Sequence, residues 1–96
     1  MLGEILNYSP FTTIGSFLGH EIEVSLDFKK ISLYIDGKKI DSSRVYLWPK
    51  RDAILLRGAI TAGEREHAVH VYGKTGLLRG SVKICVNGRR IAGDDF

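Results

Sequence analysis

A ten-residue pattern occurs twice in this chain, 51 residues apart, and it limits the folds that the chain can adopt. The first copy covers residues 31–40 and reads ISLYIDGKKI, and the second covers residues 82–91 and reads VKICVNGRRI. Each copy is an alternating apolar strand followed by Asp-Gly or Asn-Gly, two basic residues and an isoleucine. Asp-Gly and Asn-Gly suit the two left-handed positions of a type I′ turn. The pattern therefore predicts two matched β-hairpins in one all-β domain.

Alternation of apolar and polar residues continues outside the two copies. Ile22, Val24 and Leu26, for example, share one face of a strand that begins near residue 20. No segment keeps a 3.6-residue apolar period, and turn signals recur along the chain. This organisation predicts an antiparallel β-sandwich, or a small barrel, of about seven to eight short strands. We expect two similar halves, residues 20–47 and residues 67–92, each with an Asp/Asn-Gly type I′ hairpin.

The length of 96 residues fits one domain with one core. Pro10 and Gly15 interrupt the N-terminal part of the chain, so residues 1–15 are expected to be a weakly ordered segment. Residues 16–96 are expected to form the single β domain.

The register of the hairpins predicts which residues face the core. In a two-residue turn Ile40 falls opposite Leu33, on the buried side, and Ile91 takes the same place in the second hairpin. Lys39 and Arg90 then point outward. We therefore expect Ile40 and Ile91 to be buried and the two basic residues to be exposed.

Two irregularities are expected in the middle of the chain. After the first hairpin the apolar residues change from even-numbered to odd-numbered positions. The alternation must therefore shift by one residue, as at a β-bulge, within residues 41–44. Residues 53–60 read as the most buried strand, and Gly58 within them indicates a bend or a close approach of another backbone.

The net charge of +3 is a modest basic excess, with acidic and basic residues interleaved. Basic pairs follow both Asx-Gly turns, and an aromatic pair precedes Pro49; the candidate binding residues are therefore Lys38, Lys39, Arg89, Arg90, Tyr46 and Trp48. An amphipathic aromatic pair at a strand end can anchor a protein partner, although Trp48 also suits a lid over the core.

Nucleic-acid binding through the basic hairpin tips is the alternative to protein binding. Such a platform needs outward aromatic residues on basic strands, and Tyr34 is the candidate for that role. Glu21 and Glu23 on the neighbouring strand would repel phosphates. Cations at hairpin ends are also a common protection against edge-to-edge pairing.

His20 and His67 hold equivalent positions at the start of matching predicted strands. Each alternates in step with the apolar residues of its strand, so each is expected on the inner face. Two converging imidazoles could begin a zinc or copper site, but no third ligand is evident in the sequence. In a sandwich with an approximate twofold axis, we expect the two strand starts to lie at opposite ends. We therefore predict no metal and no cofactor.

Catalytic signatures are not found in the sequence. Cys85 lies within an alternating strand, away from any loop or helix N-terminus that could activate a thiol. Ser42 and Ser43 lack a Gly-x-Ser-x-Gly elbow, and the glycines fall at turns rather than before a helix. We predict that the protein is not an enzyme; a metal-dependent or hydrolytic enzyme is the third alternative.

The single cysteine excludes an internal disulfide and fits a reducing compartment. The N-terminus shows neither a basic nor an apolar signal region, and the longest strongly apolar run is only residues 53–56. We expect a cytoplasmic protein without membrane association.

From His20 to Ile91, the chain resembles the β-domain of the Fas apoptosis inhibitory molecule family. The matching segments, in order, are the strand His20 to Val24, the hairpin Tyr34 to Lys38, the segment Val45 to Trp48, Arg57-Gly58, and Val86 to Arg89. The resemblance implies an all-β, non-enzymatic module that acts through protein contacts. A small non-catalytic β module that binds protein is therefore the function we expect.

Overall fold

Eight β-strands and no helix are found in the part of the chain that the structure describes. The structure is a computed structural model that describes residues 11–27, 30–45, 48–75 and 80–96. Its strands are β1 (Phe11–Phe17), β2 (His20–Asp27), β3 (Lys30–Ile35), β4 (Lys38–Arg44), β5 (Ala53–Ala62), β6 (Arg65–Thr75), β7 (Gly80–Val86) and β8 (Arg89–Gly93). Among these residues there is consequently no helix that could cross a bilayer.

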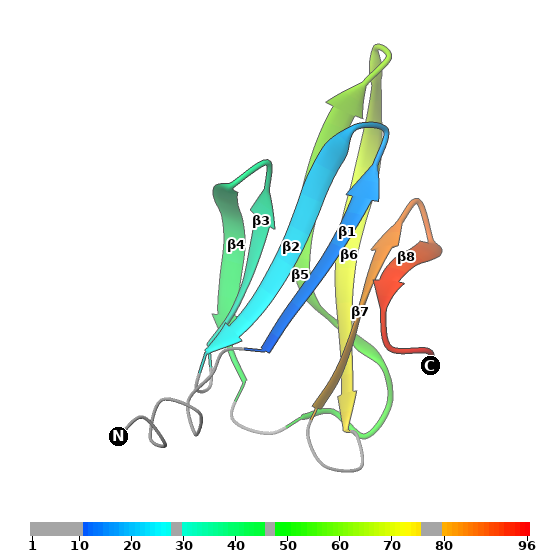
Figure 1. The fold of residues 1–96 in the computed structure, drawn as a ribbon. Helices are drawn as coiled ribbons and strands as arrows, with labels where there is room; N and C mark the ends of the chain where they lie inside the picture. Colours follow the sequence, from blue (N-terminus) through cyan, green and yellow to red (C-terminus); the bar gives the residue numbers. More distant parts are fainter. Residues whose placement is uncertain (1–10, 28–29, 46–47, 76–79) are drawn as a thin grey trace.

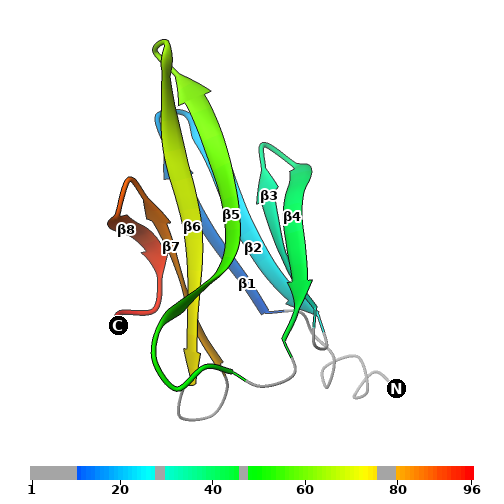
Figure 2. The ribbon, with the colours of Figure 1, turned by 180° about the vertical axis from the view of Figure 1, so that it is seen from behind.

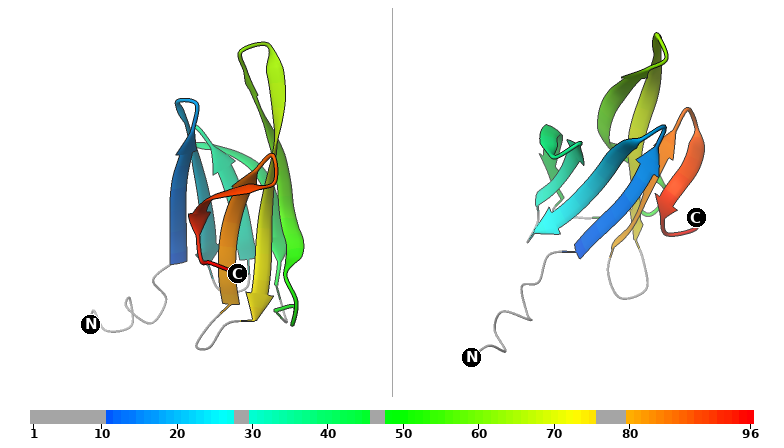
Figure 3. Two further views of the ribbon diagram at one scale, coloured as in Figure 1. Left: turned by 90° about the vertical axis from the view of Figure 1, so that its right-hand side faces the viewer. Right: turned by 45° about the horizontal axis from the view of Figure 1, so that its top comes forward.

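The strands form two antiparallel sheets, each with its strands in sequence order. Sheet A contains β1-β2-β3-β4 and sheet B contains β5-β6-β7-β8. Figure 1 shows the two sheets face to face, and the left view of Figure 3 shows them as two layers. The predicted antiparallel β-sandwich with two similar halves is confirmed. β1 takes in residues 11–15, so the sandwich begins earlier than the boundary at residue 16 that the sequence suggested; residues 1–10 lie outside the described residues.

Aliphatic side chains from the inner faces of both sheets form one core. The buried members are Ile22, Val24, Ile31, Leu33, Ile35, Val45, Leu56, Ile60, Val69, Val71, Val82, Ile84 and Val86. The inner strands β3 and β7 are the most buried, whereas β5 buries only Leu56 and Ile60. The expectation that residues 53–60 are the most buried strand is therefore wrong, because β5 is an edge strand of sheet B.

Both Asx-Gly hairpins contain a bulge at the same position. In the first, Tyr34 pairs with Lys39 and Leu33 pairs with Asp41, which leaves Ile40 as the extra residue. Ile40 therefore does not lie opposite Leu33, and the slip occurs one residue before the predicted segment 41–44. The predicted burial of Ile40 is wrong, since this side chain is 41% exposed, while Lys39 is exposed as predicted.

The second hairpin repeats the irregularity. Cys85 pairs with Arg90 and Ile84 pairs with Ala92, so Ile91 is the extra residue. Ile91 is only half-buried, against the expected full burial, and Arg90 is exposed as expected. The two halves thus share a bulged isoleucine three positions after the turn glycine, which is a structural repeat that the sequence pattern had suggested.

Each bulged isoleucine faces a glycine on the edge strand of the opposite sheet. A methyl group on Gly58 of β5 would lie 3.0 Å from Ile40 Cγ2 and 3.1 Å from Leu33 Cδ2. A methyl group on Gly15 of β1 would lie 2.8 Å from Ala92 Cβ and 3.3 Å from Ile91 Cδ1. The sequence predicted a bend or a close backbone approach at Gly58; the close approach is made by side chains, those of Ile40 and Leu33.

These contacts relate the halves by an approximate twofold axis that runs along the strands. Gly15 pairs with Ile22, two residues after His20, and Gly58 pairs with Val69, two residues after His67. β1 accordingly lies against β8, and β4 lies against β5 (Figure 1). The glycines let the edges of the two sheets approach each other on both flanks.

We predict that Gly58→Ala lowers the free energy of unfolding by about 1–3 kcal/mol, because the added methyl group overpacks the flank. Without this contact, alanine in place of a strand glycine would stabilise the protein by roughly 0.5–1 kcal/mol. The sign of the change in the free energy of unfolding therefore distinguishes the two cases. Urea denaturation measures the change.

A double-mutant cycle tests the cause of that loss. Ile40→Ala should partly rescue Gly58→Ala, with a coupling of at least about 0.5 kcal/mol. Ile91→Ala, the equivalent change on the other flank, is the control and should be additive with Gly58→Ala. Equal coupling to both isoleucines would contradict the flank contact.

Candidate functional site

The four two-residue turns among the described residues lie at one end of the sandwich, which we call the turn end (Figures 1 and 2). The turns are Leu18-Gly19, Asp36-Gly37, Gly63-Glu64 and Asn87-Gly88, and all eight residues have positive φ. The left-handed turns predicted at Asp36-Gly37 and Asn87-Gly88 are confirmed, and two further turns of the same kind accompany them.

The expectation that the two histidines lie at opposite ends is wrong. His20 begins β2 and His67 is the third residue of β6, both at the turn end, and the His67 ring stacks edge-on against Phe17, with 5.0 Å between ring centroids. Phe17 is the strand partner of His20. The reason is that the twofold axis runs parallel to the strands, and such an axis leaves equivalent strand ends at the same end of the molecule.

In the first half, the side chain of Asp36 ties its own turn to β2. Asp36 Oδ1 accepts a hydrogen bond from the backbone N–H of Glu21 (2.9 Å), and Asp36 Oδ2 accepts one from His20 Nδ1 (2.7 Å). The Asp36 N–H donates to the Glu21 carbonyl (2.8 Å). The hydrogen bond from His20, followed by that from Glu21, lowers the pKa of the Asp36 carboxyl below its ordinary value of 3.8.

The second half repeats this arrangement with an amide. Asn87 Oδ1 accepts from the backbone N–H of Ala68 (3.1 Å), and the Asn87 N–H donates to the Ala68 carbonyl (2.9 Å). Asn87 Nδ2 lies 2.8 Å from His67 Nδ1. Since the amide nitrogen only donates, His67 Nδ1 is an acceptor, whereas His20 Nδ1 is a donor. The Nδ1 atoms of the two equivalent histidines thus have opposite hydrogen-bonding roles.

The four candidate cations are all exposed and flank the turn end on two sides. Figure 1 shows the β3–β4 turn, with Lys38 and Lys39, on one side and the β7–β8 turn, with Arg89 and Arg90, on the other. The β1–β2 and β5–β6 turns lie between them. The basic pairs therefore share one end of the molecule but do not form one continuous basic patch.

Exposed acidic residues accompany the basic turns at this end of the molecule. The β5–β6 hairpin extends farthest from the body of the molecule in Figures 1 to 3, and it carries the exposed residues Glu64, Arg65 and Glu66. Asp36 lies at the base of one basic turn and is also exposed. The turn end consequently presents charges of both signs.

An exposed leucine lies at the same end, and the sequence analysis did not single it out. Leu18 is 62% exposed and has φ of 49°, a left-handed conformation that non-glycine residues rarely adopt. The signal in the sequence was the pair Leu18-Gly19 between two apolar β segments, where a turn would more usually contain Asn or Asp.

Trp48 lies away from the turn end. Its ring fills the space over two glycines, and a methyl group on Gly80 would lie 1.9 Å from Trp48 Cε2. Thr75 Oγ1 donates to the carbonyls of Trp48 and Pro49 (3.0 Å each) and fixes this segment beside the end of β6. Trp48 is thus a half-buried lid over the core rather than a neighbour of the cations. Tyr46, its predicted companion, lies outside the described residues.

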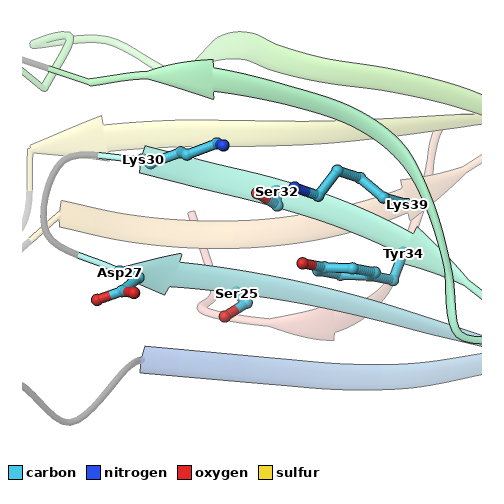
Figure 4. A pocket seen from close by; sticks show the side chains of 6 residues that line it. All are labelled: Ser25, Asp27, Lys30, Ser32, Tyr34 and Lys39. Atoms are coloured by element: carbon cyan, nitrogen blue, oxygen red, sulfur yellow. The ribbon is translucent and has the colours of Figure 1, made fainter.

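A shallow polar hollow of about 220 Å³ lies on the outer face of sheet A. Figure 4 shows its lining residues on strands β2, β3 and β4: Ser25, Asp27, Lys30, Ser32, Tyr34 and Lys39. Lys39 Nζ lies 5.9 Å from the centre of the Tyr34 ring. Asp27 is the strand partner of Lys30, and Glu23 is the strand partner of Tyr34, so carboxylates accompany the cations of this face.

The described residues contain no group of three or more His, Cys, Asp or Glu side chains placed to hold a metal ion. Each histidine of the turn end instead uses Nδ1 in a hydrogen bond within the chain. The thiol of Cys85 is free but buried in β7, and Cys85 is only 4% exposed.

Comparison of the chain with protein-family models, curated proteins and solved structures found no significant match. The resemblance to the Fas apoptosis inhibitory molecule family therefore remains an expectation from the sequence.

The contrast between Asp36 and Asn87 predicts a difference in acid sensitivity. Because the pKa of Asp36 is lowered in the folded protein, its stabilising effect is present above the unfolded-state pKa and is lost as pH falls through the lowered value. Asp36→Asn copies the second half and removes this titration. The thermal midpoint of the wild type should therefore fall relative to that of Asp36→Asn as pH drops from about 5 to about 2.

Thermal melts at several pH values measure the difference, and the other carboxylates cancel because both proteins contain them. Glu64→Gln, at an exposed acid of the β5–β6 turn, is a matched control that should leave the profile parallel to the wild type. A difference in thermal midpoint between wild type and Asp36→Asn that stays constant over this pH range would contradict the hydrogen-bond assignment.

Proposed function

We propose that the protein is a non-catalytic β-sandwich module that binds another protein through its turn end, and that it does so in the cytoplasm. The module class agrees with what the sequence resemblance implies. The free, buried thiol of Cys85 is compatible with a reducing compartment.

The observation that carries this proposal is the state of Leu18. A leucine in the left-handed region costs on the order of 1–2 kcal/mol, and its exposed apolar side chain gains nothing from the core. Strained residues of this kind cluster at functional surfaces. Contact with a partner would bury the Leu18 side chain and give this residue a role that folding does not.

The mixed charges of the turn end favour a protein partner over a nucleic acid. Glu64 and Glu66 are exposed on the β5–β6 hairpin, which extends beyond the two basic turns (Figure 1), and a phosphate backbone at this end would meet these carboxylates as well as the cations. Charges of both signs around an apolar centre are typical of protein–protein interfaces, which have an apolar middle and a polar rim.

The chemistry of the described side chains supports a non-catalytic role. A nucleophile needs exposure and an activating neighbour, and Cys85 is buried within a strand. The two histidines are held by Asp36 and Asn87 in hydrogen bonds that serve the turns. The polar hollow on sheet A combines hydroxyl groups with Asp27, Lys30 and Lys39, groups that can bind a polar ligand.

Leu18→Asn separates folding from binding. Asn-Gly suits a type I′ turn, so this variant should be more stable than the wild type by about 1 kcal/mol, as measured by urea denaturation. Leu18→Ala removes the same apolar group without relieving the backbone and should not be more stable. Both variants should lose partner binding. A Leu18→Asn protein that is less stable than the wild type would assign Leu18 a structural role instead.

Site-specific photo-cross-linking in cells tests the binding surface. A photoreactive phenylalanine analogue at position 18 should give a protein adduct, whereas the same analogue at Arg51, an exposed residue near the other end, should not. Nuclease and protease digestion identify the class of the adduct. A nuclease-sensitive adduct, together with binding to random oligonucleotides that weakens steeply with salt, would support nucleic-acid binding instead. Equal adducts at both positions, or none, would contradict a binding site at the turn end.

A further inference from the structure

The polar hollow on the outer face of sheet A exists because short side chains lie between long ones. Ser25 of β2 pairs with Ser32 of β3, so two short hydroxyl side chains lie next to each other in the middle of the face. Tyr34 and Lys39, which are strand partners, border the serines on one side, and Lys30 borders them on the other. The long side chains enclose the hollow of about 220 Å³ above the serines.

Two ammonium groups converge on this hollow. Figure 4 shows the side chains of Lys30 and Lys39 extending toward each other over Ser32, one from β3 and the other from β4. Lys39 Nζ lies 5.9 Å from the centre of the Tyr34 ring. Within the described part of the chain, neither ammonium group forms an ion pair with a carboxylate. The hollow therefore holds two positive charges that no contact with a carboxylate neutralises.

The position of Lys30 is not explained by the needs of the sheet. Cations on the edge strand β4 protect it against pairing with other strands, which accounts for Lys39. Lys30, however, is on the inner strand β3 and lies directly opposite Arg44, and like charges at opposed positions destabilise a sheet. Asp27 is the other strand partner of Lys30, but its carboxylate points away from both ammonium groups in Figure 4. An anion in the hollow would relieve this repulsion.

Hydroxyl groups complete the set of hydrogen-bond donors around the hollow. Ser32, which is only 6% exposed, forms the floor, and Ser25 lies beside it. The Tyr34 hydroxyl points toward the same space in Figure 4. Hydroxyl groups can donate to an anion, and ammonium groups donate shorter and stronger, charge-assisted hydrogen bonds. An anion with several oxygen atoms can thus be bound from below and from both sides.

We propose that this hollow binds the phosphate group of a small phosphomonoester. Such a group carries a charge of about −1.5 to −2 at pH 7 and has three strong acceptor oxygens. Its charge matches the two ammonium groups, whereas a phosphodiester carries a single negative charge. The volume of about 220 Å³ is smaller than the roughly 300–1,000 Å³ of pockets that enclose drug-sized ligands, so the hollow suits a compact molecule.

The carboxylates of β2 favour a small ligand over a nucleic acid. Glu23 pairs with Tyr34, and Asp27 pairs with Lys30, so β2 carries an acidic residue on each side of Ser25 along its outer face. An extended polyanion would pass over these carboxylates and be repelled. A compact phosphomonoester instead keeps its charge beside the ammonium groups of β3 and β4. This site is on a face of sheet A, away from Leu18 and the contacts proposed for the turn end.

Titration of the isotopically labelled full chain with glycerol 3-phosphate, followed by the amide chemical shifts, tests the proposal. We expect saturable changes at Ser25, Ser32 and Lys39, with a dissociation constant on the order of 1 mM. Glycerol alone should cause no such changes, because it lacks the charged group, and inorganic phosphate should shift the same amides.

Variants that lose one donor test which groups bind the phosphate. Lys30→Gln and Lys39→Gln should each weaken binding of glycerol 3-phosphate at least about fivefold, since each removes a charged donor. Lys50→Gln, which removes the same charge at an exposed residue outside the hollow, should bind like the wild type. Tyr34→Phe leaves the net charge unchanged and should weaken binding about two- to tenfold. Thermal melts confirm that each variant is folded.

Several results would overturn the proposal. These are the absence of saturable shifts at tenfold the expected dissociation constant, equal effects of Lys39→Gln and Lys50→Gln, and binding of glycerol as tight as that of glycerol 3-phosphate. An oligonucleotide or a phosphoserine peptide that binds the hollow more tightly than glycerol 3-phosphate would assign the site to a macromolecule and would also overturn it. Leu18→Asn should bind the probe like the wild type, so this test and the test of the turn end can fail separately.

Discussion

The contact between a bulged isoleucine and a strand glycine, made once on each flank, determines how the two sheets of this protein face each other. Ile40 meets Gly58 where β4 lies against β5, and Ile91 meets Gly15 where β1 lies against β8. A side chain at either glycine would push the sheet edges apart. An isoleucine in a regular, unbulged strand would point to one face of its own sheet instead of contacting the edge strand of the other sheet. The core between the sheets closes because each flank has both a glycine on one edge strand and a bulged isoleucine on the facing edge strand.

The approximate twofold axis that results explains the positions of the functional candidates. Because the axis runs along the strands, the four described two-residue turns lie at one end, and Trp48 packs against the core away from that end. The turn end therefore combines two basic hairpins, an acidic arm and the exposed Leu18. Both halves repeat the hydrogen bond from the first turn residue to the neighbouring strand. The carboxylate of Asp36 makes it in one half and the neutral amide of Asn87 makes it in the other, so the halves differ in charge at this position.

Short-range signals predicted the parts of the fold that depend on local conformation. Asp36-Gly37 and Asn87-Gly88 require positive φ, and alternation of apolar residues identified β2, β3 and β7 without any tertiary information. A bulge was expected, but not at Ile40. The change in apolar alternation shows that one residue is inserted, but it does not show which residue. Its place depends on Gly58, which is distant in the sequence.

The arrangement of the halves was not accessible to the same reasoning. His20 and His67 were expected at opposite ends because sequence parity gives a face and not the direction of a symmetry axis. Leu18 was missed because leucine is not a usual turn residue, and β1 was missed because Gly15 was interpreted as an interruption of order. In each case tertiary packing overrides the local preference.

Nuclear Overhauser effects in the protein labelled at isoleucine methyl groups test the central claim most directly, because they report proximity at each flank without any mutation. The contacts described here predict a cross-peak from the Ile40 Cγ2 methyl to the α-protons of Gly58, and an equivalent one from the Ile91 Cδ1 methyl to those of Gly15. Methyl groups of Ile22 and Ile84, which lie within the core, provide the reference intensities. Cross-peaks at both flanks support an isoleucine–glycine closure on each side; their absence from either flank, with the hairpin cross-peaks intact, would contradict it.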